Sequence, residues 1–118
     1  MPIVDITLIG EASAAPTPCA ELAHAIGQAL GAAAGSVWLT LTQRPAGDYA
    51  ENGPLPSPLP VFVRVLARGD DRAARAAQAR AIAGAVAAKL ARPADRVHVI
   101  FEPDADGRVY FGGRPDQN

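Results

Sequence analysis

The sequence predicts an α+β fold made of two β-α-β units in tandem, and three patterns indicate it. A strand-like stretch over 2–9 recurs from Pro60 onward, each time followed by apolar residues at helical spacing and then by an alternating strand. At an offset of 60, the matched apolar positions are Leu22, Ile26 and Leu30 with Ile82, Val86 and Leu90, and Val37, Leu39 and Leu41 with Val97, Val99 and Phe101. The opening strands, which begin at Pro2 and Pro60, match at an offset of 58. We expect their inward and outward side chains to alternate in the same phase.

A length of 118 residues allows one compact domain and is too short for two independent cores. We expect a single domain of two repeats, about 1–53 and 60–113. A segment rich in glycine and proline, 46–59, links them. A loop of this length either wraps the surface or forms part of a site.

Residues at the helix ends fit this division. Thr17 is expected to cap the first helix with Pro18 at its first position, where the missing N–H costs nothing. Asp70 and Asp71 can cap the second helix.

Two such units give a four-stranded sheet with both helices on one face. The third and fourth strands are apolar even at adjacent positions, within 61–63 and 97–101, so the second face also needs cover. The chain contains no third layer. We therefore predict self-association.

Composition excludes several classes of protein. Eleven Lys and Arg against twelve Asp and Glu leave a net charge of −1, which argues against a general nucleic-acid binder. No apolar run approaches the roughly 20 residues of a membrane span, and the first residues lack signal-peptide features. With one cysteine, Cys19, we expect a cytoplasmic protein. Two histidines and one cysteine make no zinc set, and we expect neither metal nor organic cofactor.

Short motifs resemble the tautomerase superfamily. Pro2 follows the initiator Met and opens the first strand, segments 97–103 and 111–113 are similar to the end of 4-oxalocrotonate tautomerase subunits, and the double length resembles fused members. Segment 43–47 looks like the stretch after the second strand in family decarboxylases and dehalogenases. The resemblance implies a homotrimer whose three sheets form a barrel, with active sites at subunit interfaces.

The resemblance also implies that Pro2, freed of Met1, is the catalytic base. A secondary amine is a base only when neutral, and an apolar pocket and a nearby cation both lower its pKa. Arg68, expected at the end of the third strand, matches an arginine that holds the substrate carboxylate in family members; a guanidinium can grip a carboxylate through two hydrogen bonds. Arg72 could assist. Arg64 is expected to share the strand face of Arg68, or to form an ion pair at the trimer interface.

Two further candidates for substrate binding lie at equivalent positions of the closing strands. His98 stands where some family members have a pocket tyrosine, and its alternative role is structural. Trp38 replaces a substrate-binding arginine, which predicts a more apolar pocket unless Trp38 packs between subunits. Tyr110 and Phe111 either close the pocket or fill the interface.

These residues predict a keto-enol tautomerase, an isomerase that acts on a small 2-oxo or 2-hydroxy-enoic acid. Family decarboxylases have an aspartate before the second strand, where this chain has residues 34–36, Ala-Gly-Ser. Hydrolytic dehalogenases have a C-terminal glutamate, where this chain has residues 108–110, Arg-Val-Tyr. Two alternatives stay open. One is a dehalogenase or decarboxylase that takes an acid from the linker, Asp48 or Glu51; the other is a non-catalytic trimeric interaction module.

Overall fold

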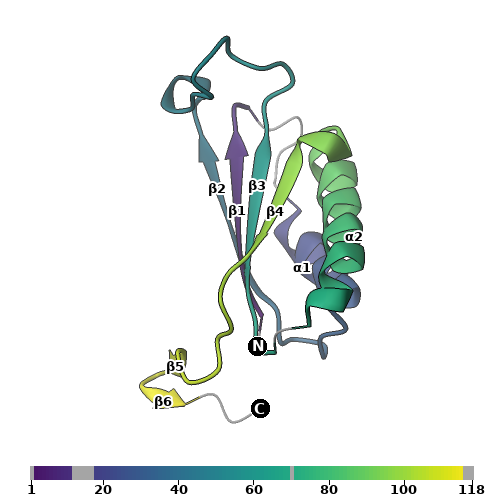
Figure 1. Ribbon diagram of the computed structural model, residues 1–118, viewed down its shortest axis with the longest axis vertical. Coiled ribbons are helices and arrows are strands. Elements are labelled where there is room, and N and C mark those ends of the chain that lie inside the picture. The colour runs from purple at the N-terminus through teal and green to yellow at the C-terminus, as the bar shows by residue number, and fades with distance from the viewer. Residues whose placement is uncertain (1, 12–17, 70, 116–118) are drawn as a thin grey trace.

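Two β-α-β units share one mixed sheet with both helices on the same face (Figure 1). The computed structural model describes residues 2–11, 18–69 and 71–115. Its elements, in order, are β1 (Ile3–Ile9), α1 (Cys19–Leu30), β2 (Trp38–Arg44), η1 (Ala46–Asp48), β3 (Val61–Leu66), α2 (Arg72–Leu90), η2 (Ala94–Arg96), β4 (Val97–Phe101), β5 (Tyr110–Phe111) and β6 (Arg114–Pro115). The sheet order is β2-β1-β3-β4. Strand β1 is parallel to β2 and antiparallel to β3, and β3 is parallel to β4. The predicted α+β fold is therefore confirmed.

The core lies between the sheet and the two helices. It consists of aliphatic residues from alternate strand positions and from one stripe of each helix: Val4, Ile6, Leu8, Leu22, Ile26, Val61, Val63, Val65, Ile82, Val86, Leu90 and Val97. Full burial of such a side chain contributes about 1.5–3 kcal/mol, so this layer holds the helices on the sheet.

The predicted offset of 58 between the opening strands is wrong. It would pair Val4, which is fully buried against the helices, with Phe62, which lies on the opposite face of the sheet. The residues that face the helices have even numbers in β1 and odd numbers in β3, so only an odd offset pairs residues of the same face. Gly10 and Gly69, both with a φ of +87° in the turn after the opening strand, correspond at an offset of 59.

The helix caps agree with the sequence in part. The Asp71 carboxylate accepts a hydrogen bond from the Ala74 N–H at 3.2 Å, so Asp71 caps α2 as predicted. Pro18 directly precedes α1 and does not occupy its first turn. Thr17 and Asp70 lie outside the described residues.

The second face of the sheet is open in the single chain. Its centre is polar, with Thr40 donating to Asp5 at 2.7 Å and Arg64 paired with Glu102 at 3.3 Å. Trp38, 57% exposed, lies at one end of this face. At that same end, where the chain begins, the β5–β6 hairpin projects past the sheet (Figure 1). Neither helix among the described residues is long and apolar enough to cross a membrane.

Candidate active site

Pro2 lines a cavity of about 250 Å³ at the end of the sheet where β1 begins. Because β1 runs antiparallel to β3, the start of β1 meets the ends of β3 and β4 at this edge. Pro2 is buried, and its carbonyl accepts the Trp38 N–H at 3.0 Å. The cavity is lined by Pro2, Leu30, Ala32, Val65, Ala67, Arg68, Gly69, Asp71, Arg75, Gln78, Phe101 and Glu102. Its wall combines apolar side chains with the guanidinium groups of Arg68 and Arg75 and the carboxylates of Asp71 and Glu102.

Arg68 lines the same cavity as Pro2, as the sequence predicted. Strand β3 ends at Leu66, so Arg68 lies in the turn beyond the strand and does not end it. Its side chain is 32% exposed and lies 3.5 Å from the Asp106 carboxylate. That distance is at the limit of a hydrogen bond, so the contact with Asp106 is weak.

Asp104 holds the turn that carries Arg68. Its carboxylate accepts the N–H of Gly69 at 3.2 Å and the N–H of Asp106 at 2.9 Å. The first bond links the turn after β3 to the segment after β4, and the second lies within that segment. Sequence reasoning missed this positioning role, because it depends on two segments that only the sheet brings together.

Arg75 is a second cation at the cavity that the sequence did not single out. Its guanidinium carbon lies 5.9 Å from the centre of the Phe101 ring, at a distance where a cation is attracted to an aromatic face. Arg72, the predicted assistant, does not line the cavity. Asp71, Arg75 and Gln78 do, because residues spaced by four and three share one helical face. That spacing is the signal in the sequence that could have found Arg75.

Arg64 does not share a face with Arg68 in the way the sequence predicted. It lies on the open face and pairs with Glu102 of its own chain at 3.3 Å. Its side chain is 54% exposed, so this pair contributes little to stability. Arg64 does not line the cavity, which leaves Arg68 and Arg75 as the arginines that do.

Trp38 and His98 are not brought to the cavity within one chain. His98 lies beside Phe62 with ring centres 5.5 Å apart, on the open face. Trp38 contacts Phe111 edge to face, with ring centres 4.9 Å apart. Trp38 and Tyr110 are 57% and 58% exposed, so this aromatic group is available to another protein surface.

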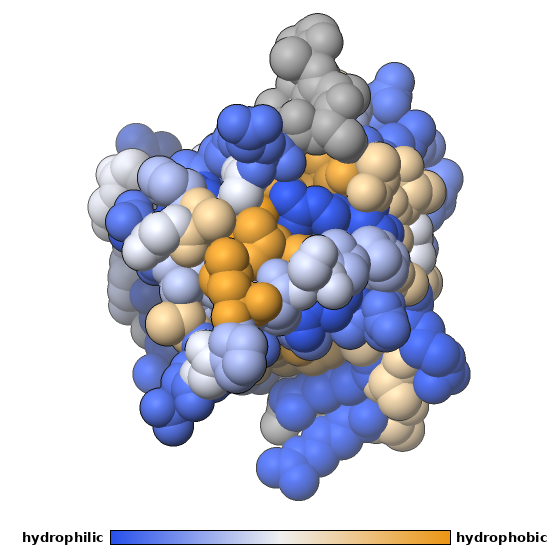
Figure 2. Space-filling model, turned by 90° about the horizontal axis from the view of Figure 1, so that it is seen from above, coloured by the Kyte–Doolittle hydropathy of each residue, from blue (hydrophilic) through white to orange (hydrophobic). Residues whose placement is uncertain are grey.

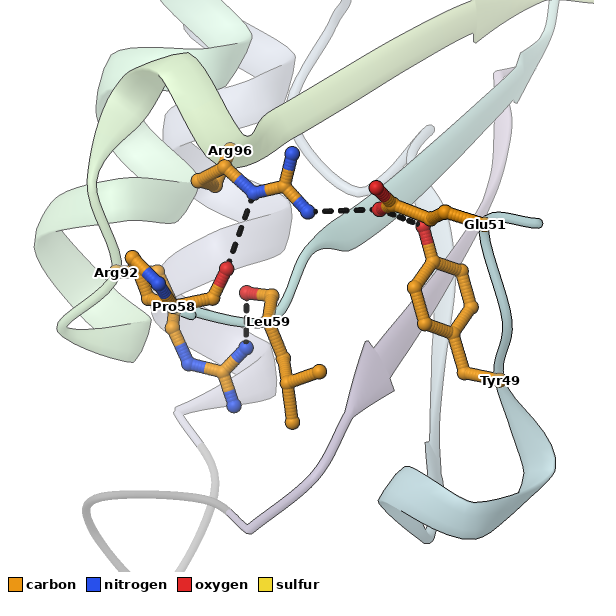
Figure 3. Close-up of polar contacts among 6 residues, drawn as sticks. All are labelled: Tyr49, Glu51, Pro58, Leu59, Arg92 and Arg96. Carbon is orange, nitrogen blue, oxygen red and sulfur yellow. Dashed lines mark hydrogen bonds and ion pairs between the residues drawn. The ribbon is translucent and has the colours of Figure 1, made fainter. Parts of the chain in front are cut away.

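The linker acids lie at the other end of the sheet. Glu51 accepts hydrogen bonds from Tyr49 and from Arg96, the latter at 2.9 Å, and these bonds hold the pKa of its carboxyl below the ordinary value (Figure 3). Arg96 precedes β4, whereas Pro2 lies near the end of that strand. Neither Asp48 nor Glu51 lines the Pro2 cavity. The linker therefore wraps the surface of the chain and forms no part of this cavity.

No group of three or more His, Cys, Asp or Glu side chains in the described part of the chain is arranged to hold a metal ion. His24, Cys19 and His98 lie on α1 and β4, and none of them lines the cavity. The polar side chains that line the cavity are those of Arg68, Asp71, Arg75, Gln78 and Glu102.

Comparison with known proteins identifies the fold. The sequence matches no protein-family model and no curated protein. Among solved structures, the symmetric trimer of a wild-type fused 4-OT matches with a TM-score of 0.79 and 22% identity, over 95% of this chain and 93% of that one. Native fused 4-OT gives a TM-score of 0.80 with 21% identity, over 96% and 94%.

Malonate semialdehyde decarboxylase matches with a TM-score of 0.72 and 20% identity, over 93% of this chain and 90% of that one. This chain has the same fold as these fused 4-OT and decarboxylase structures. The resemblance drawn from short motifs is confirmed at the level of the fold.

Proposed function

We propose that the chain is a cofactor-independent keto-enol tautomerase of a small 2-oxo or 2-hydroxy-enoic acid. The observation that carries the proposal is the shared cavity of Pro2 and Arg68, which come from opposite ends of antiparallel strands. Once Met1 is removed, Pro2 has a basic secondary amine. The apolar part of the wall and the two arginines disfavour its protonated form, and Asp71 and Glu102 act in the opposite direction.

The proposed reaction moves one proton. Arg68, with Arg75 as a second cation, holds the substrate carboxylate and orients the enol toward Pro2. The Pro2 nitrogen takes the enol O–H proton, the C–C double bond shifts, and the same nitrogen returns a proton to carbon. Negative charge develops on the enolate oxygen and is stabilised by the nearby guanidinium groups.

We further propose that the chain works as a homotrimer. The fused 4-OT structure that matches over 95% of this chain is a symmetric trimer. The open sheet face and the exposed Trp38 and Tyr110 offer a surface for such contacts. In that assembly Trp38 and His98 would serve the substrate site of a neighbouring copy, which sedimentation and mutation can test.

The test is the rate of ketonisation of 2-hydroxymuconate, on protein whose intact mass shows that Met1 is absent. Wild type should turn over rapidly and Pro2→Ala should lose most of the rate. Pro60→Ala is the matched control, because Pro60 precedes β3 but its nitrogen is a peptide amide with no basicity. Equal rates in wild type and Pro2→Ala would remove Pro2 as the base. Binding of the acid without turnover would indicate a non-catalytic module or another carboxylic-acid chemistry.

A further inference from the structure

The internal repeat relates the Pro2 cavity to a second position at the opposite end of the sheet. The Ala32 N–H donates to the Gly27 carbonyl at 2.9 Å, and the Arg92 N–H donates to the Ala87 carbonyl at 3.1 Å. Both bonds close the end of a helix, at an offset of 60. Ala32 and Arg92 are therefore equivalent residues of the two copies.

The turns after the opening strands supply the other half of the equivalence. Gly10 and Gly69 both have a φ of +87° and correspond at an offset of 59. By the same offset, Ile9 is the counterpart of Arg68. The cavity residues Ala32, Arg68 and Gly69 thus correspond to Arg92, Ile9 and Gly10.

At the second position, Arg92 stands in place of Ala32. Its guanidinium donates to the carbonyls of Leu59 at 2.7 Å, Ile9 at 2.8 Å and Glu11 at 3.1 Å. One guanidinium nitrogen lies 3.6 Å from where a Cβ on Gly10 would be. Figure 3 shows this guanidinium pointing at the Leu59 carbonyl. The Arg96 side chain, which donates to Glu51 of the linker, lies beside it.

The two positions have opposite polarity. The Pro2 cavity presents two guanidinium groups, which suit a carboxylate, beside the carboxylates of Asp71 and Glu102, whereas the second position presents three carbonyl oxygens and, among the described residues, no guanidinium other than that of Arg92. A hollow beside these carbonyls is lined by Gly10, Glu11, Gln43, Pro45, Ala46 and Leu59, of which none is basic. Seen from this end, the molecule shows an apolar patch framed by hydrophilic side chains (Figure 2).

We propose that this second position is a cation site, which the chain fills with its own Arg92. The site takes a guanidinium, which supplies N–H donors in a planar fork to three backbone acceptors. It rejects carboxylates, so each chain binds one carboxylate, at Pro2. The statement that a carboxylate binds at Pro2 rests on the proposed function, but the cation site does not.

The experiment removes the internal guanidinium and supplies an external one. Arg92→Ala should lower the Tm by on the order of 10 °C, because three bonds from a charged donor are lost. Millimolar ethylguanidinium should restore most of that loss by binding the native state, whereas ethylammonium at the same ionic strength should not. Wild type and Arg80→Ala, which removes an exposed arginine of α2, should show no selective response.

The proposal would be overturned if ethylguanidinium and ethylammonium raised the Tm of Arg92→Ala equally. It would also be overturned if ethylguanidinium raised the Tm of wild type and of Arg92→Ala equally. If Arg92→Ala does not fold alone, its refolding yield from urea should rise with ethylguanidinium and not with ethylammonium, and no rise also overturns it. The carboxylate is measured separately by calorimetry with 2-hydroxymuconate. Absence of binding there refutes the proposed function and leaves the guanidinium result to stand by itself.

Discussion

Arg68→Gln separates a substrate-binding arginine from a structural one. The Arg68 side chain is 32% exposed and the Asp106 side chain beside it is 73% exposed, with 3.5 Å between guanidinium and carboxylate. Such an exposed pair contributes about 0–1 kcal/mol to stability. A charge-assisted hydrogen bond to a substrate carboxylate contributes about 1.5–3 kcal/mol. The variant should therefore lose roughly 10- to 150-fold in kcat/KM, while its free energy of unfolding changes by about 1 kcal/mol or less.

The assay is steady-state ketonisation of 2-hydroxymuconate, with urea unfolding of the same preparations. Asp106→Asn is the matched control, because it removes the competing carboxylate and keeps Arg68. Its kcat/KM should equal or modestly exceed that of wild type. An Arg68→Gln protein with unchanged kcat/KM would refute the binding role, and so would a loss of activity that merely follows a loss of several kcal/mol in stability.

Three other predictions concern the core, the linker and the open face. Leu22→Ala removes a fully buried side chain of α1 and should cost about 2–5 kcal/mol in urea unfolding, and a cost below about 1 kcal/mol would contradict the core assignment. Hydrogen bonds from Tyr49 and Arg96 hold the Glu51 pKa below its ordinary value. Their contribution to stability is therefore present above the unfolded-state pKa and is lost as pH falls through the folded-state pKa. Glu51→Gln should thus lower the Tm at pH 7, and its difference from wild type should shrink in acid; a difference that persists there argues against the ion pair. Trp38→Ala should weaken self-association in sedimentation velocity without lowering the helix content, and an unchanged sedimentation coefficient would exclude Trp38 from the interface.

The sequence alone determined the order of elements and the pair of residues on which the proposed chemistry depends. Apolar spacing of 3.6 and 2 residues is local, so it identifies helices and strands without knowledge of their neighbours. Asp71 was predicted as a cap for the same reason, since its partner Ala74 lies one turn away. Pro2 and Arg68 were chosen through a resemblance of short motifs, and the structure places both at one cavity.

Only the tertiary structure decided which face of each strand is buried and which arginines line the Pro2 cavity. The offset between opening strands is 59, and an error of one residue moves every side chain to the opposite face. Arg75 faces the cavity and Arg72 does not, because the starting residue of α2 sets the direction of each later side chain. Helical phase and strand register depend on turns and on distant packing, and sequence periodicity alone leaves both undetermined.

The contrast between Ala32 and Arg92 is the clearest case. The repeat makes the two residues equivalent, and the sequence shows that one is small and the other charged. Only the tertiary structure places the turn after β1 and the end of the linker beside Arg92, and it is their carbonyls that Arg92 contacts. Those carbonyls belong to segments far apart in the chain, and their convergence is a property of the packed sheet. Sequence thus determined the composition of the two sites, and the fold decided that one is open and the other filled.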